Sequence, residues 1–170
     1  KKADEFITID PAFQSYISAF TSGIISKESS IRIRLAQENA SFTESGQEFG
    51  MGDLFSFSPN ISGKSYWVDN RTIEFIPEKN FISGQLYTCT FQLNKVCDVK
   101  EDKLKEFIFQ FQIIRQYFNV ETYTHKTYVK TDLKRNKIPG LLTTADVATP
   151  DEVEKILQAS QQLKNLSITW

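Results

Sequence analysis

Hydrophobic and polar residues alternate along most of the chain up to Phe118. In Ile31–Leu35, for example, isoleucine and leucine alternate with arginine. Such alternation is typical of a β-strand with one face in the core and the other in water. The longest alternation runs from Phe107 to Phe118, and proline or glycine marks the ends of several shorter ones. Roughly seven strands at about ten-residue spacing predict an Ig-like β-sandwich, which we place at residues 15–118.

The pattern changes after Phe118. Residues 120–130 are rich in threonine and tyrosine and are expected to be extended, and Leu141–Thr144 is expected to be a short strand. The sequence Thr149-Pro150-Asp151-Glu152 has the features of a helix start: an N-cap threonine, a proline at the first helical position and a capping-box glutamate. The apolar spacing that follows predicts a helix near residues 150–163.

Both ends of the chain indicate a piece of a longer protein. Residues 1–14 begin with the polar run Lys1–Glu5 and are expected to form a tether. The chain ends at Trp170, in the middle of the alternating pattern Leu166–Trp170, which predicts a strand. A natural protein rarely ends on a tryptophan in mid-strand. We therefore expect residues 119–170 to be a second, incomplete β unit that contains one helix.

Composition and charge exclude several classes of protein. The 170 residues include 20 basic and 21 acidic side chains, a net charge of −1, whereas a nucleic-acid-binding domain normally shows a basic excess. The sequence has no run of about 18 apolar residues that would span a membrane. The single histidine, His125, has no nucleophile at a characteristic spacing, and the mixed charges of residues 101–106 fit a solvated loop better than a calcium site. We expect no catalytic activity, no cofactor and no metal site.

The two cysteines, Cys89 and Cys97, are too far apart in sequence for a zinc or redox pair. Cys89 lies within an alternating run that also contains Tyr87 and Leu93, so its side chain is expected to point into the core. A buried free thiol is the favoured interpretation, and a Cys89–Cys97 disulfide is the alternative.

Aromatic residues supply the candidate core. Trp67 is large enough to fill the space between two sheets about 10 Å apart. Tyr87 comes three residues after Gly84 and is placed for a tyrosine corner, in which the ring packs inside and the hydroxyl bonds to backbone upstream. The predicted structural core comprises Trp67, Phe75, Tyr87, Phe109 and Phe111. A platform of exposed aromatic rings for sugar binding is the alternative role.

Three segments together carry a family resemblance: Phe55–Pro59, Tyr66–Pro77 and Gly84–Thr88. They combine a strand that ends in proline, a tryptophan before a turn and an apolar alternation, and a Gly-x-x-Tyr motif. The pattern resembles a bacterial Ig-like domain, and most closely the N-terminal module of the large alpha-2-macroglobulin-like proteins of Bacteroidetes. Phe20–Ser26 and Phe107–Gln112 are also similar to that group, and Leu142–Asp146, the following helix and Trp170 look like the start of its next domain.

The resemblance implies a role within a larger protein. Such proteins inhibit endopeptidases by trapping: a protease cuts a bait segment, the inhibitor rearranges, and the protease is caged. The resemblance also implies an extracytoplasmic location, in the periplasm or at the cell surface, with a lipid-anchored N-terminus. The chain would then be a non-catalytic structural module, whose partners are the neighbouring domains of its own chain and, for the parent protein, proteases and the membrane.

The family's reactive centre is a Cys-x-Glu-Gln thioester, which this chain does not reproduce. In Cys89-Thr90-Phe91-Gln92, Phe91 stands in place of the glutamate and the motif lies within a predicted strand. We therefore expect no thioester. The second hypothesis is an Ig-like adhesion or carbohydrate-binding module of a bacterial surface protein, which an exposed row of tyrosine and tryptophan side chains would favour.

Overall fold

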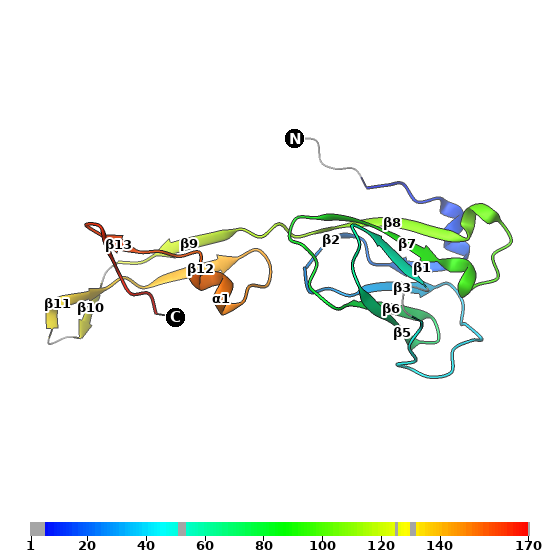
Figure 1. The fold of residues 1–170 in the computed structure, drawn as a ribbon, viewed down its shortest axis with the longest axis horizontal. Helices are drawn as coiled ribbons and strands as arrows, with labels where there is room; N and C mark the ends of the chain where they lie inside the picture. Colours follow the sequence, from blue (N-terminus) through cyan, green and yellow to red (C-terminus); the bar gives the residue numbers. More distant parts are fainter. Residues whose placement is uncertain (1–5, 51–53, 125, 130–131, 170) are drawn as a thin grey trace. The chain divides into compact units, whose positions relative to one another are not determined.

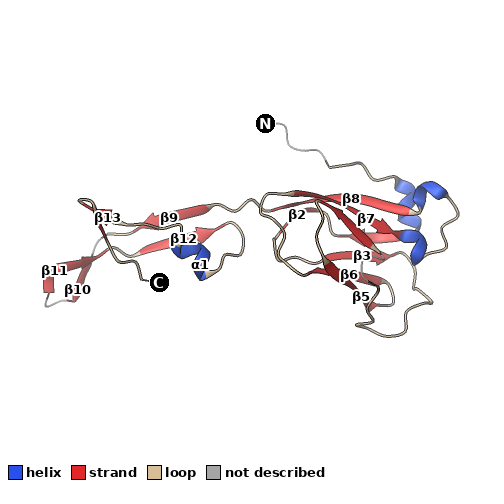
Figure 2. Ribbon diagram, viewed as in Figure 1, coloured by secondary structure: helices blue, strands red, loops and turns tan. Residues whose placement is uncertain are grey.

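The computed structural model of the protein describes residues 6–50, 54–124, 126–129 and 132–169. Strands account for 41% of the structure and helices for 11%, so the chain is mainly β, as predicted. It divides into two compact units between Arg115 and Gln116. Figure 1 labels strands of both units and helix α1, and Figure 2 distinguishes strands from helices and loops.

The first unit contains two four-stranded sheets (Figure 1). Sheet A has the order β1-β3-β6-β5, and all its neighbours are antiparallel. Its strands are β1 (Ile17–Phe20), β3 (Ile31–Leu35), β6 (Thr72–Pro77) and β5 (Gly63–Asp69). Sheet B has the order β2-β8-β7-β4, with β2 parallel to β8. Its strands are β2 (Gly23–Ile25), β8 (Glu106–Ile113), β7 (Leu86–Gln92) and β4 (Phe55–Ser58).

This strand order is that of an immunoglobulin-type sandwich. If β1 and β2 are taken as two halves of a first strand, one sheet holds the first, second, fifth and fourth strands and the other holds the third, sixth and seventh. The chain changes sheets between β1 and β2 at Gly23, whose φ of 78° favours glycine. The alternation in the sequence therefore predicted the sandwich correctly.

Aromatic and branched side chains fill the space between the sheets. The five residues that the sequence assigns to the core are all buried: Trp67, Phe75, Tyr87, Phe109 and Phe111. The rings of Tyr87 and Phe111 stack with centroids 5.6 Å apart. In β3 every inward isoleucine or leucine is buried and both arginines are exposed, which is the pattern that the sequence predicts.

Tyr87 forms the predicted tyrosine corner near the start of β7. Its ring is buried, and its hydroxyl accepts a hydrogen bond of 3.3 Å from the backbone N–H of Ile82, five residues upstream. The ring also contacts Phe81, with centroids 5.0 Å apart. The tyrosine therefore fixes the connection between β6 and β7 onto the core.

Replacing Tyr87 with phenylalanine is expected to lower the free energy of unfolding by about 1 kcal/mol, because the Ile82 N–H loses its partner while the ring stays. Denaturant unfolding of the purified chain measures the loss. Tyr66→Phe is a matched control, since Tyr66 lies half-buried on β5. Equal stability of Tyr87→Phe and the unchanged chain would show that the corner hydrogen bond contributes nothing.

Trp67 is covered by a loop that the sequence pattern does not single out. The connection between β3 and β4 places Phe42 and Phe49 against the indole, with ring centroids 6.0 Å and 5.3 Å away. The same loop bonds to the edge of β5, because the N–H of Trp67 donates to the carbonyl of Gln47 at 3.0 Å. Trp67 is thus enclosed by its own loop as well as by the sheets.

The predicted polar tether at residues 1–14 is partly wrong. Residues 1–5 lie outside the described residues, but η1 (Pro11–Ser15) is a 3₁₀ helix capped by Asp10. Its Phe13 is buried, and the ring lies 4.9 Å from that of Phe107. The correction has a simple physical reason, since Phe13 gains more from burial in the core than from exposure to water. The remaining 3₁₀ helices are η2 (Leu93–Lys95) and η3 (Asp102–Leu104).

The second unit consists of short antiparallel ribbons and one helix. Strand β9 (Phe118–Thr122) pairs with β12 (Gly140–Thr144), and β10 (Lys126–Val129) pairs with β11 (Asp132–Lys137). The long strand predicted at 107–118 is in fact two strands, because β8 ends at Ile113 and β9 begins at Phe118. The boundary between the units accordingly precedes the predicted one.

The helix predicted near residues 150–163 is much shorter in the structure. Helix α1 (Pro150–Glu154) starts with the predicted capping box, in which the Thr149 hydroxyl accepts from the Glu152 N–H and the Glu152 carboxylate accepts from the Thr149 N–H. It ends early because its apolar side does not pack into a core: Ile156 is 43% exposed.

The residues after α1 form a small hairpin instead, from β13 (Ser160–Gln161) and β14 (Lys164–Asn165). The turn residues of this hairpin, Gln162 and Leu163, have φ values of 49° and 63°. This left-handed conformation is unfavourable for residues other than glycine and asparagine. Residues 166–169 are not a strand, contrary to the prediction, and Trp170 lies outside the described residues.

Candidate functional site

Few side chains of the described residues could carry covalent or metal chemistry. Within that part of the chain, no group of three or more histidine, cysteine, aspartate or glutamate side chains could hold a metal ion. His125 lies outside the described residues. No described helix is long and apolar enough to cross a membrane.

The Cys89–Gln92 motif is built into strand β7, where the two side chains take opposite faces. Cys89 points into the core and is fully buried, and both cysteines are free thiols. Gln92 lies on the outer face of sheet B, and its Nε2 donates to Oε1 of Glu106 at 3.0 Å. A Cys–Gln cross-link would require β7 to leave the sheet, which agrees with the expectation of no thioester.

The two thiols are expected to react at different rates. Burial raises the pKa of both, and far more for Cys89 than for half-buried Cys97, because burial disfavours the charged thiolate. At about pH 8 a thiol-specific disulfide reagent should modify Cys97 in the native chain and both cysteines in denaturant. Peptide mapping by mass spectrometry identifies the sites. If Cys89 were modified before Cys97 in the native chain, Cys89 would not be buried. If neither cysteine reacted even in denaturant, the two would form a disulfide.

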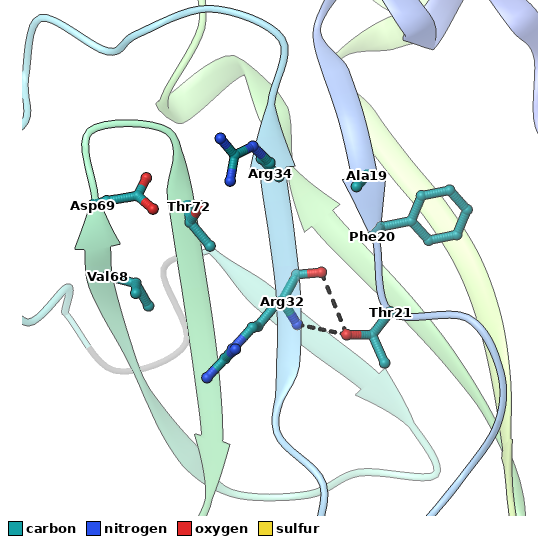
Figure 3. A pocket seen from close by; sticks show the side chains of 8 residues that line it. All are labelled: Ala19, Phe20, Thr21, Arg32, Arg34, Val68, Asp69 and Thr72. Atoms are coloured by element: carbon teal, nitrogen blue, oxygen red, sulfur yellow. Dashed lines mark hydrogen bonds between the residues drawn. The ribbon is translucent and has the colours of Figure 1, made fainter.

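The outer face of sheet A carries a polar hollow of about 360 Å³, lined mainly by polar and charged residues (Figure 3). Register places Ala19, Arg34 and Thr72 directly opposite one another on β1, β3 and β6. Directly opposite residues share a face of the sheet, so the small Ala19 and Thr72 leave open space on each side of the arginine. Val68 and Asp69 at the end of β5 close the row.

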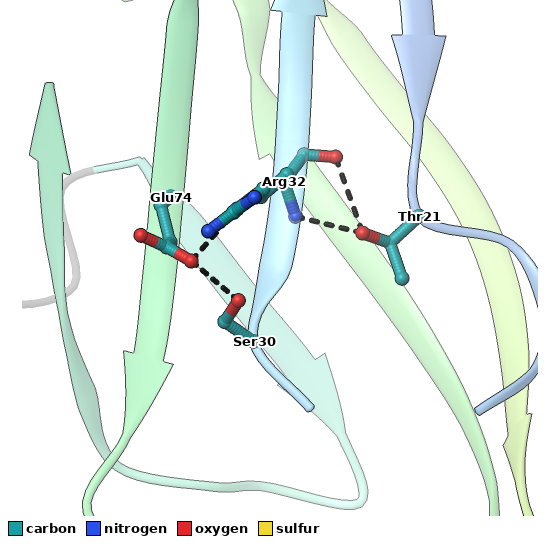
Figure 4. Close-up of polar contacts among 4 residues, drawn as sticks. All are labelled: Thr21, Ser30, Arg32 and Glu74. Carbon is teal, nitrogen blue, oxygen red and sulfur yellow. Dashed lines mark hydrogen bonds and ion pairs between the residues drawn. The ribbon is translucent and has the colours of Figure 1, made fainter. Parts of the chain in front are cut away.

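A polar network borders this hollow (Figure 4). The Nε of Arg32 donates to Oε1 of Glu74 at 2.8 Å, and the Ser30 hydroxyl donates to the same carboxylate oxygen at 2.5 Å. On the other side of β3, the Thr21 hydroxyl accepts from the backbone N–H of Arg32 at 2.8 Å. Glu74 is only 14% exposed, so the network holds its carboxylate and the Arg32 side chain in place.

Asp69 is held in its ionised form at the end of the hollow. Partial burial acts to raise the pKa of its carboxyl, but hydrogen bonds from Arg71 and Thr72 and the charge of Arg34 hold the pKa below its ordinary value. The Arg71 N–H donates to Oδ1 at 2.8 Å. With Asp69 negative and Arg34 positive, the hollow can recognise a polar partner by hydrogen bonds and charge. None of the described residues that line it is a histidine, cysteine or lysine.

The exposed aromatic residues do not form a row on the sandwich. Among the described residues, Trp67 is buried and Tyr66 is half-buried. The tyrosines that the structure describes as exposed, Tyr117 and Tyr123, both belong to the second unit. The feature that would favour the carbohydrate-binding hypothesis therefore does not occur on the described faces of the two sheets.

Sequence reasoning did not predict the polar hollow, because its residues come from four strands and meet only through register. From the sequence, the arginines of β3 were predicted only to lie on the solvent-exposed face of a strand. Their neighbours Glu74 and Asp69 lie more than thirty positions away, on β6 and β5. Comparisons with protein-family models, with curated proteins and with solved structures found no match.

Proposed function

We propose that this chain is a non-catalytic structural module of a longer, cell-surface protein similar to the alpha-2-macroglobulin-like endopeptidase inhibitors. Its task is to position neighbouring domains of the same chain. The parent protein would trap proteases, and an N-terminal lipid anchor would hold it at the membrane outside the cytoplasm. The sequence resemblance suggests the parent class, and the physical character of the two units supports the structural role.

The observation that carries the proposal is the unequal distribution of buried apolar residues. Every buried hydrophobic residue of the described chain lies between Phe13 and Ile113. In the second unit, by contrast, no described hydrophobic residue is buried, and the exposed ones include Tyr117, Val120, Leu166 and Ile168. Such exposure is costly in water and is typical of a surface that packs against further protein. The first unit is thus a self-sufficient sandwich, and the second is suited to contact other domains.

The proposal is tested on the native protein. Antibodies raised against the purified chain should detect a protein much larger than 19.6 kDa in extracts of the source cells, in the membrane fraction. Protease added to intact cells or spheroplasts should digest it if it lies outside the cytoplasm. A cytosolic protein of the chain's own mass would contradict the proposal.

The isolated chain is expected neither to inhibit proteases nor to react with methylamine. A trap needs a bait segment and a body that encloses the protease, whereas this unit is a filled sandwich with Cys89 fully buried in it. The test incubates the chain with trypsin or elastase and then assays the protease on a protein substrate. Mass spectrometry after methylamine treatment checks Gln92. Protection of the substrate at one chain per protease, or a methylamine adduct at Gln92, would contradict the structural role.

A further inference from the structure

A second hollow, of about 400 Å³, lies on the side of the sandwich between η1 and β1. We call it the side notch. Its apolar floor consists of Phe13, Phe20 and Phe107, and the ring of Phe107 lies 4.9 Å from Phe13 and 5.0 Å from Phe20. Gln14 of η1, which is exposed, forms part of its rim. The side notch can therefore accept an apolar side chain from outside.

The side notch adjoins an open sheet edge. Among the described residues, strand β1 is the outermost strand of sheet A and pairs only with β3. Half of the backbone groups of an edge strand point away from its neighbour and can pair with another strand. Across the notch, β2 pairs with β8 only at Phe111–Ile113, so within the described residues the earlier half of β8 has a strand on one side only.

Within the described residues, the edge of β1 is protected by its short length and its bulge but by no paired loop. At the opposite edge of sheet A, the chain's own loop pairs with β5: the Gly46 N–H donates to the Trp67 carbonyl at 2.7 Å and the Phe49 N–H to the Ser65 carbonyl at 2.8 Å. Strand β1, with the sequence ISAF, carries neither a charge nor a proline. Natural edge strands commonly use both to prevent pairing. The register shift near Ile17 limits a partner to a short segment.

Charge identifies the partner's outward side chains. Arg34 lies directly opposite Ala19 of β1, so the two share the outer face of the sheet. A strand added beside β1 would place its outward side chains beyond the Ala19 methyl group, within reach of the guanidinium. In the free chain Arg34 extends towards Asp69 and Thr72 (Figure 3). Exposed side chains change rotamer readily, so Arg34 can turn to a carboxylate on the added strand.

We propose that the edge of β1 and the side notch bind an extended peptide segment of another protein, in which apolar and acidic side chains alternate. The segment adds a strand to sheet A, inserts an apolar side chain into the side notch and presents a carboxylate to Arg34. A second copy of the chain is a poorer occupant, because β1-to-β1 pairing brings no carboxylate and places two Arg34 side chains on one face. The proposal goes beyond the structural role and does not depend on the class of parent protein.

The test uses a capped synthetic peptide of about seven residues in which glutamate and valine alternate, titrated into the whole isotope-labelled chain. Saturable amide shifts and slower hydrogen exchange are expected at Ser18–Thr21. Two control peptides carry lysine in place of glutamate, or the same residues with the valines in one block. Both are expected to bind at least about tenfold more weakly.

Two variants separate the contributions of charge and notch. Arg34→Glu should weaken binding of the glutamate–valine peptide at least about tenfold and strengthen binding of the lysine–valine peptide. Gln14→Trp should fill the side notch and weaken binding by a similar factor. Lys79→Glu is the matched control, because Lys79 is exposed and follows β6. Each variant is used only if its amide spectrum retains the pattern of β3, β6 and β7.

Several results would overturn the proposal. They are amide shifts at β4 or in the second unit instead of β1, equal binding of the block peptide, or no effect of either Arg34→Glu or Gln14→Trp. Self-association that both variants abolish, together with failure of every peptide to bind, would identify a second copy as the occupant and would also overturn it.

Discussion

Replacing Trp67 with alanine is expected to lower the free energy of unfolding by about 3–5 kcal/mol. The indole is buried and contacts the rings of Phe42 and Phe49. The substitution therefore creates a cavity and also loosens the loop that protects the edge of β5. Since a folded domain has a total stability of only about 5–15 kcal/mol, the variant should melt at a much lower temperature or accumulate poorly.

Tyr66→Ala is the matched control for this experiment. Tyr66 is the neighbour of Trp67 on β5 and is half-buried on the opposite face of the strand. Its removal should cost markedly less than the removal of Trp67. Thermal and denaturant unfolding measure both variants under the same conditions. An unchanged melting temperature for Trp67→Ala would show that the indole is exposed in solution and would revive the hypothesis of a sugar-binding platform.

The sequence alone predicted the sandwich well because its strands obey local rules. The alternation of Ile31, Ile33 and Leu35 with polar residues directly reflects a strand with one buried face, and β3 shows this burial pattern. The tyrosine corner was also predictable, because its geometry depends on residues only a few positions apart. Local patterns of this kind specify faces and turns, but they do not specify which strands become neighbours.

Long-range packing explains what the sequence did not predict. Phe13 belongs to a segment that is polar on average, and its burial depends on Phe107, which lies far along the chain. Phe42 lies in a loop without periodicity, so only the fold reveals that it covers Trp67. The pair of Arg32 and Glu74 follows from the register between β3 and β6. The candidate site therefore depends on register, and periodicity does not encode register.

The helix predicted at residues 150–163 is too long, although the local signal for its start is correct. The capping box at Thr149 and Glu152 is a local signal, and the structure confirms it. The length of a helix depends instead on a surface against which its apolar side can pack. Ile156 stays exposed in the second unit, so burial of an apolar side does not stabilise a longer helix there.

Replacing Gly63 with alanine is expected to destabilise the sandwich by about 3 kcal/mol, at the upper end of the range for overpacked cores. Gly63 is buried at the start of β5 and pairs with Pro77 of β6. A Cβ atom built there would lie within 3.0 Å of the Phe75 ring and of the Ile76 carbonyl oxygen. The ring is held by Phe55 and Phe57, with centroids 5.7 Å and 4.6 Å away, so it cannot move aside without disturbing the core.

Gly46→Ala separates this steric effect from the general cost of replacing glycine. Gly46 has a φ of 84° and open space around the position of a Cβ, so its replacement strains the backbone without a clash. That variant should lose only about 1–2 kcal/mol. Urea unfolding of both variants, with the slope compared as well as the midpoint, measures the difference. If Gly63→Ala were as stable as Gly46→Ala, then β5 and β6 would not approach as closely as the structure indicates. The packing of Phe75 under the edge of sheet A would then need to be revised.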